Sequence, residues 1–211
     1  MNPSAVVFDI GGVLIDWNPV HLYGPIFRDE QATEAFLRDI CNAAWNEQFD
    51  AGKPFADGIA ELISAYPDKA ELICIYWDRW EEMLGGEIAG TVDILRRLKN
   101  ARIPVHAISN FSAETFPRAV AVFPFLDQFD TLVVSGREGL IKPDPEIFHL
   151  FLRRAGLDAA DCIFIDDKAD NIAAAASLGF HTLHFKDAGQ LEERLVSLGL
   201  LTPAVEGAGD E

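Results

Sequence analysis

The chain has 211 residues, and its 49% apolar and 24% charged residues are typical of a folded globular protein rather than a disordered or fibrous one. It carries 17 Lys and Arg against 34 Asp and Glu, a formal net charge of −17. We therefore expect no binding to nucleic acid, whose phosphate backbone requires a cationic protein surface. A single small anion is not excluded, because one local cation or metal ion can hold it.

Three widely spaced cysteines, Cys41, Cys74 and Cys162, predict neither a disulfide framework nor a metal-ligand cluster. They are typical of buried thiols in a reducing compartment. No apolar run approaches the ~18 residues of a membrane span. We expect a cytoplasmic protein that binds no membrane and exists as a monomer or a homodimer.

Short apolar runs predict five strands, at residues 5–8, 104–109, 131–134, 162–165 and 181–185. Between and after these runs, helical patterns cover residues 91–100, 113–122, 145–155, 169–178 and 189–198. Asp144 followed by Pro145 is typical of a helix start. Strands separated by single helices favour an α/β fold, a Rossmann-like parallel sheet with helices on both faces.

Residues 16–88 depart from this alternation, because they show three helical patterns, at residues 30–46, 55–66 and 69–84, and no strand. We interpret them as an all-helical cap inserted after the first strand, with hinges at residues 16–19 and 85–86. The predicted α/β core then comprises residues 1–15 and 89–203. The acidic, Gly-rich residues 204–211 are expected to be a disordered tail.

Polar side chains follow several of the predicted strands, and in parallel sheets ligands bind at the carboxyl ends of the strands. The residues concerned are Asp9, Ser109, Asn110, Lys142, Asp166 and Asp167. Three acids close together are unfavourable without a cation, so this set favours a metal ion at that edge. Each residue taken alone also fits a bland role as a cap, a turn former or a surface charge. His106, inside a predicted strand, and Trp45, in the predicted cap, are interpreted as core residues.

Four segments occur in the order of a known set of motifs. They are FDIGGVL at residues 8–14, Ser109–Asn110, Lys142–Pro143, and IDDKADN at residues 165–171. Together they resemble the haloacid dehalogenase-like (HAD) hydrolase superfamily, which places its commonest cap where residues 16–88 stand. Within it, the chain is most similar to the branch of bacterial α-D-glucose-1-phosphate phosphatases.

The resemblance implies a role for each of these residues. Asp9 would be the nucleophile that forms an aspartyl-phosphate, and Lys142 would neutralise charge on it. Mg²⁺ would be held by Asp9, the carbonyl of Gly11 and Asp167. Other residues would bind phosphoryl oxygens or support the metal site. The phosphate-binding residues would be Gly11, Gly12, Ser109, Asn110 and Lys142, and the supporting residues Asp166, Asp170 and Asn171.

One position departs from the family pattern. Phosphatases of this superfamily usually carry a second aspartate two residues after the nucleophile, where it acts as general acid and base, and here that residue is Gly11. Asp16, His21 and Glu47 in the predicted cap are candidate replacements.

The missing acid leaves three functions open. The favoured one is a Mg²⁺-dependent phosphomonoester hydrolase acting on a small phosphorylated metabolite such as a sugar phosphate. A metal-independent 2-haloacid dehalogenase needs no acid at the leaving halide, but three carboxylates suit a cation better than a carboxylate substrate. A non-catalytic regulator that binds metal or phosphate is the third.

Overall fold

The computed structural model describes residues 2–203, and its centre is a five-stranded sheet in the order β5-β4-β1-β6-β7. All four neighbouring pairs are parallel. The predicted α/β fold is therefore confirmed, and each strand lies within one residue of its predicted bounds at either end. The strands are β1 (Ala5–Phe8), β4 (Val105–Ser109), β5 (Leu132–Val134), β6 (Cys162–Asp166) and β7 (His181–His184).

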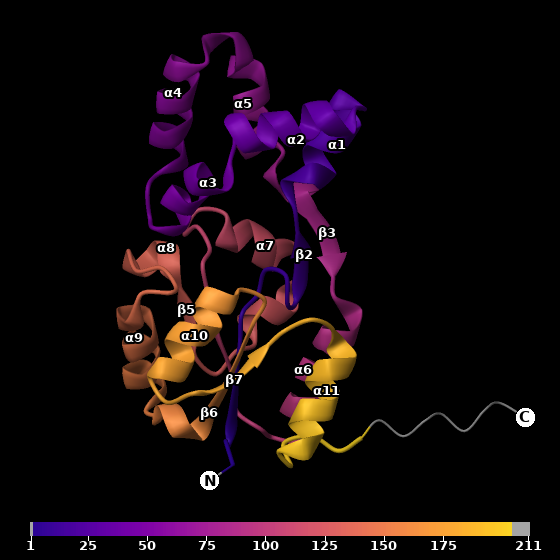
Figure 1. The fold of residues 1–211 in the computed structure, drawn as a ribbon, viewed down its shortest axis with the longest axis vertical. Coiled ribbons are helices and arrows are strands. Elements are labelled where there is room, and N and C mark those ends of the chain that lie inside the picture. The colour runs from indigo at the N-terminus through magenta and orange to yellow at the C-terminus, as the bar shows by residue number, and fades with distance from the viewer. Residues whose placement is uncertain (1, 204–211) are drawn as a thin grey trace, which may run out of the picture.

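Helices cover both faces of this sheet (Figure 1). Alternate residues of β1 pack on opposite faces of the sheet: Val6 and Phe8 belong to one apolar cluster, and Ala5 and Val7 belong to the other. The first cluster is shared with α6 (Ala89–Asn100), α7 (Phe116–Val122) and α11 (Ala188–Ser197), and the second with α9 (Pro145–Ala155) and α10 (Ala169–Ser177).

The helix start predicted at Asp144 and Pro145 is confirmed. The Asp144 side chain accepts a hydrogen bond from the Glu146 backbone N–H at 2.9 Å, and α9 begins at Pro145 as expected. The helix predicted from residue 113 begins later, at Phe116, and its N-cap Thr115 makes no side-chain capping bond. A short helix, α8 (Ser135–Glu138), was not predicted.

Residues 16–88, called the cap from here on, extend from the sheet edge as a group of helices (Figure 1). They are α1 (Pro19–Phe27), α2 (Glu30–Asp39), α3 (Ala43–Asp50), α4 (Phe55–Ala65) and α5 (Ala70–Asp78), with 3₁₀ turns at Pro67–Lys69 and Trp80–Met83. The expected single helix over residues 30–46 was wrong, because Asn42 starts a new helix by accepting a hydrogen bond from the Trp45 N–H at 2.9 Å. Helix α1 was missed, although Asn18 and Pro19 form its start.

The expectation that this segment lacks strands was also wrong. The two predicted hinges pair with each other as an antiparallel ribbon of β2 (Ile15–Trp17) and β3 (Leu84–Glu87). Backbone hydrogen bonds hold this ribbon, and Gly85 and Gly86 contribute no side-chain alternation that a sequence pattern could reveal.

Aromatic side chains form the interior of the cap. Trp45 lies edge-on to Phe49 and Tyr76, at ring-centroid distances of 4.7 and 4.9 Å, and its indole N–H donates to the Gly58 carbonyl at 3.2 Å. The interpretation of Trp45 as a core residue is therefore confirmed. No helix in residues 2–203 is long and apolar enough to cross a membrane. The predicted disordered tail, residues 204–211, lies outside the described residues.

Candidate active site

Three acids and one lysine meet at the carboxyl edge of the sheet. Asp9 follows β1 directly, Asp166 ends β6, and Asp167 is the next residue, and carboxylate oxygens of all three lie within 4.8 Å of one another. The Lys142 ammonium contacts Asp9 Oδ1 at 2.9 Å and Asp166 Oδ2 at 2.7 Å. The structure thus brings together four residues that the sequence pattern expected at this edge.

Lys142 is fixed in this position from several sides. It is only 2% exposed, and its ammonium also donates to the Ile108 carbonyl at 2.8 Å. Burial lowers the pKa of Lys142, but the facing carboxylates of Asp9 and Asp166 outweigh it, so that its pKa lies above the usual value. The Asn110 side chain exchanges two hydrogen bonds with the Lys142 backbone, at 2.8 and 2.9 Å. Asn110 therefore orients the loop that carries the lysine.

Asp9 has one carboxylate oxygen engaged and one free. Oδ1 accepts hydrogen bonds from the Ile10 N–H at 2.7 Å and contacts Lys142, whereas Oδ2 has no donor among residues 2–203. Burial raises the pKa of Asp9 to about 6, against the lowering effect of Lys142 and with a further rise from Asp166. A cation bound at this edge would favour the charged form of Asp9, which is the nucleophilic one.

Asp166 and Asp167 are adjacent but have different surroundings. The buried Asp166 carboxylate is saturated by Lys142, by the Asn171 amide at 3.0 Å to both oxygens, and by the Lys168 N–H at 2.8 Å. Asp167 is exposed, and its carboxylate receives no side-chain hydrogen bond within the described part of the chain. Burial of part of that side chain and the charge of Asp166 raise the pKa of Asp167.

This donor set fits a divalent cation. Asp167 offers carboxylate oxygens that the described protein leaves unpaired, the Asp9 carboxylate lies beside it, and oxygen is the donor that hard ions such as Mg²⁺ prefer. Asp166 and Asn171 hold the strand end and helix start between which Asp167 lies.

The first loop brings its backbone against this site. Gly11 and Gly12 both border the cavity described below. Gly12 has a φ of 74°, and a Cβ there would lie 2.7 Å from Asp167 Oδ2, so a side chain at position 12 would be strained and would displace the acid. A Cβ at Gly11 would have no atom within 4 Å.

Two expected site residues lie apart from the cavity. Ser109 is 1% exposed, its hydroxyl has no hydrogen-bond partner within residues 2–203, and it is absent from the cavity lining. Asp170, in the first turn of α10, is exposed and makes no hydrogen bond to the acidic group within the same residues. The structure does not bring either side chain into contact with Asp9 or Asp167.

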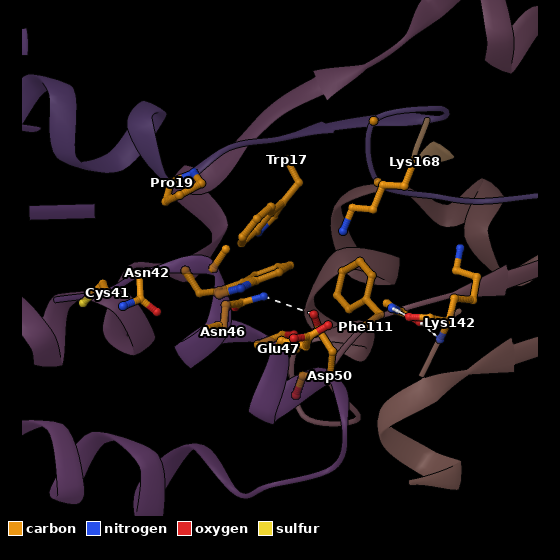
Figure 2. A pocket seen from close by; sticks show the side chains of 18 of the residues that line it. Trp17, Pro19, Cys41, Asn42, Asn46, Glu47, Asp50, Phe111, Lys142 and Lys168 are labelled. Atoms are coloured by element: carbon orange, nitrogen blue, oxygen red, sulfur yellow. Dashed lines mark hydrogen bonds between the residues drawn. The ribbon is translucent and has the colours of Figure 1, made fainter. Parts of the chain in front are cut away.

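A cavity of about 600 Å³ lies between this sheet edge and the cap (Figure 2). Its size is ordinary for a small-molecule site. The cap and the loop after β4 contribute mainly aromatic and apolar surface. These residues are Trp17, Pro19, Leu37, Phe55, Tyr76, Trp80 and Phe111. Four polar residues of the cap also line it: Asn42, Asn46, Glu47 and Asp50.

Sequence reasoning missed two charged residues of this cavity, Asp50 and Lys168, which both point into it in Figure 2. Lys168 stands inside the IDDKADN segment, so its position next to Asp167 was a signal that it lies at the sheet edge. Asp50 had no such signal, because it belongs to no motif and reaches the cavity through the packing of α3.

Comparison with known proteins gives one family and several relatives. The model of the haloacid dehalogenase-like hydrolases matches residues 3–179. The sesquiterpene phosphatase astK of Aspergillus oryzae is 30% identical over 198 residues, 87% of this chain and 90% of that protein. An (S)-2-haloacid dehalogenase of Pseudomonas fluorescens is 34% identical over 92 residues, 44% of this chain and 40% of the relative.

A solved structure shares the fold. It is a HAD family enzyme from Bacteroides thetaiotaomicron in complex with magnesium and inorganic phosphate. The TM-score is 0.64 at 23% identity, and the match covers 88% of this chain and 95% of that one.

Proposed function

Since the chain belongs to the haloacid dehalogenase-like hydrolases, we propose that it hydrolyses phosphate monoesters through an aspartyl-phosphate on Asp9. The observation that carries this proposal is the free Oδ2 of Asp9 in a cavity that also exposes Asp167 and Lys168. A carboxylate fixed at a strand end, with its other oxygen held by Lys142, is suited to attack phosphorus.

Magnesium is the proposed cofactor, and Asp9, Asp167 and the carbonyl of Gly11 would hold it. When bound, it neutralises negative charge on the nucleophile and on the phosphoryl group. The need for such a cation follows from the charges: Asp9, Asp166 and Asp167 face one buried ammonium, and the substrate would add further negative charge. The magnesium and phosphate complex of the structural relative supports this choice.

The chain's own residues perform the remaining tasks of the proposed reaction. The Lys142 ammonium holds Asp9 Oδ1 and leaves Oδ2 to form the bond to phosphorus. We assign the phosphoryl oxygens to the amide of Gly11 at the cavity wall, and the positive charge of Lys142 offsets their negative charge. The Gly12 amide donates to the Ile15 carbonyl at 2.9 Å and Ser109 does not line the cavity, so neither is assigned this role. Asp166 keeps Lys142 in place through its 2.7 Å contact.

Selection of the substrate is assigned to the cap. A sugar phosphate is one candidate, because Asn42, Asn46 and Glu47 offer hydrogen-bonding groups to hydroxyls. An ester with an apolar organic group is the second candidate. The aromatic lining, including Trp17 and Trp80, and the similarity to a sesquiterpene phosphatase favour it.

The two other functions are less well supported. A 2-haloacid dehalogenase shares part of its sequence with this chain, but its carboxylate substrate would enter a site with three acids. A regulator without turnover would not need the free Asp9 oxygen beside Lys142. Both remain outcomes of the experiment below. We place the activity in the cytoplasm, because the three cysteines are unpaired.

Asp9→Asn tests the proposal, because the amide cannot serve as the nucleophile. We expect turnover of sugar phosphates and prenyl phosphates to fall by more than about 10³-fold while the thermal midpoint of unfolding stays near that of the wild type. Phosphate release is measured with Mg²⁺ and with EDTA. Full activity in the variant ends the proposal, and metal-independent chloride release from 2-chloropropionate would instead establish the dehalogenase.

A further inference from the structure

The cap supplies an acid to the cavity. We propose that Asp50, the last residue of α3, protonates the leaving oxygen of the ester and then accepts a proton from the attacking water. The inference rests on the proposed phosphatase function and adds a catalytic residue to it. It assigns to the cap the proton transfer that Gly11, at the sheet edge, cannot perform.

Few acids line the cavity. Within residues 2–203 its carboxylates are Asp9, Glu47, Asp50 and Asp167. Asp9 is the proposed nucleophile, and Asp167 is left unpaired for the cation. Glu47 lines the cavity but is exposed to solvent. Asp50 is therefore the best-enclosed acid that has no other task.

The two other candidates from the sequence are excluded by position. Asp16 and His21 pair with each other at 2.8 Å where β2 meets α1. Neither residue lines the cavity. Their side chains crowd Gly85 in the ribbon instead, since a Cβ there would lie 2.3 Å from Asp16 Oδ2 and 2.5 Å from His21 Nε2.

Asp50 is held by both the cap and the core. Its Oδ2 accepts a hydrogen bond from the Asn46 amide at 3.1 Å, drawn in Figure 2. The Tyr76 hydroxyl donates to Asn46 Oδ1 at 2.8 Å, which directs the NH₂ group of Asn46 toward Asp50. From the core, the Ser135 hydroxyl donates to the Asp50 carbonyl at 2.6 Å. A proton donor requires such fixed placement.

The charges around Asp50 suit an acid that first donates a proton and later accepts one. Burial raises its pKa to about 7, and Lys168 across the cavity opposes this rise. Glu47, on the same helix, and Asp9, at the sheet edge, raise it further. Tyr76 also faces Asp50 and stays neutral, because burial holds its pKa well above the usual value. Asp50 thus carries its proton near neutral pH, and Lys168 stabilises the carboxylate formed after transfer.

The proton balance closes over two steps. In the first, Asp9 Oδ2 bonds to phosphorus, the bond from phosphorus to the leaving oxygen breaks, and the Asp50 proton moves to that oxygen to give the alcohol. In the second, water attacks phosphorus, the Asp9 bond breaks, and the Asp50 carboxylate takes the proton of the water. The products are alcohol and inorganic phosphate, and Asp50 is protonated again.

Asp50→Asn tests the inference with two aryl phosphates, phenyl phosphate and p-nitrophenyl phosphate. Nitrophenolate leaves without protonation far more readily than phenolate. We therefore expect kcat/KM to fall by about 10²-fold or more for phenyl phosphate and by less than tenfold for p-nitrophenyl phosphate. The ratio of kcat/KM for the two compounds is measured on one preparation of each protein. A smaller fraction of folded protein lowers both values equally and leaves their ratio unchanged. A burst of p-nitrophenol followed by slow turnover is expected from the impaired second step.

Two further variants control the result. Asp57→Asn, an exposed residue of α4 that does not line the cavity, should keep the wild-type ratio. Adding Gly11→Asp to Asp50→Asn should restore at least tenfold of the activity on phenyl phosphate, because position 11 has room for a side chain. In the wild type, kcat/KM for phenyl phosphate should decline above about pH 7, and in Asp50→Asn this decline should vanish.

The outcomes separate this inference from the proposed function. If the protein is active on both compounds but the ratio is unchanged in Asp50→Asn, or changes equally in Asp57→Asn, the role of Asp50 alone is overturned. A wild-type protein that releases phosphate from neither compound, with Mg²⁺ present, overturns both proposals.

Discussion

Asp50 illustrates how a single carboxyl can serve chemistry at a cost to stability. Its side chain is partly buried beside two other acids, Glu47 and Asp9, and its charged form is disfavoured there. A position selected only for stability would carry a neutral residue that keeps the hydrogen bond from Asn46. An acid at this point is what a catalytic requirement predicts.

This cost makes the stability of the protein depend on pH. The pKa of Asp50 rises from 3.8 to about 7 on folding, so the folded chain keeps a proton that the unfolded chain releases. The free energy of unfolding therefore falls as pH rises from about 4 to about 7. Asp50→Asn removes this dependence of the free energy of unfolding on pH. At pH 8 the thermal midpoint of the variant should exceed that of the wild type, by about 2–4 °C for each kcal/mol gained in the free energy of unfolding.

Thermal unfolding at pH 5 and at pH 8 gives the midpoint of the variant minus that of the wild type. The titration of all other acids cancels in this difference, because both proteins contain them. An advantage of the variant that is the same at both pH values would contradict the raised pKa of Asp50.

At the scale of elements, the contact between α3 and α4 positions the catalytic end of α3. Gly58 of α4 lies against the ring of Phe49, which precedes Asp50 and stacks on Phe55 at 3.9 Å between ring centroids. A Cβ at position 58 would lie 2.3 Å from the Phe49 ring. Because Phe49 is buried and stacked, it has little room to move.

Gly58→Ala should therefore destabilise the protein by about 1–3 kcal/mol through overpacking, and should lower activity by shifting the end of α3. Denaturant unfolding and phosphate release measure the two effects. Gly24→Ala in α1 is the matched control, because its nearest contact, a methyl of Val20, would be 3.9 Å away. That control should be neutral or up to about 1 kcal/mol more stable. Equal effects in both variants would contradict the crowding at Gly58.

The elements also show what the sequence can predict. Buried parallel strands such as β1 and β6 are short continuous apolar runs, which is why their bounds could be predicted closely. The ribbon of β2 and β3 could not, because Gly85 and Gly86 have no side chains to alternate. Helix α1 was missed because Gly24 and Pro25 interrupt its helical pattern.

Some residues of the site could likewise be predicted from the sequence, and others could not. Asp9, Lys142 and Asp167 follow strand ends or stand in motifs, so their convergence could be predicted from topology. Asp50 could not be predicted, because its place in the cavity depends on how α3 packs against α4 and on the bond from Ser135. Tertiary packing of the cap leaves no local signal in the sequence.

At the scale of the whole molecule, the net charge of −17 includes three acids that meet at the sheet edge. Three carboxylates face one buried ammonium there. Mutual repulsion of these acids opposes folding until a cation joins them. The metal should therefore act on stability as well as on activity.

Adding Mg²⁺ should raise the free energy of unfolding by about 2.7 kcal/mol at a concentration 100 times its dissociation constant. Thermal unfolding with Mg²⁺ and with EDTA measures this effect, and EDTA should also stop phosphate release. Asp167→Asn should abolish the shift, whereas Asp158→Asn, an exposed acid before β6 at the opposite edge of the sheet, should keep it. A shift retained in Asp167→Asn would contradict the proposed ligands.

The open space at Gly11 has a consequence for how such enzymes diverge. Nothing within 4 Å would oppose a Cβ there, whereas Gly12 next to it is locked by its backbone and by Asp167. The glycine codons GGU and GGC become aspartate codons by one base change, so a lineage with either codon gains the sheet-edge acid in a single mutation. The cap acid would then be redundant, and the cap sequence would be free to drift toward new substrates.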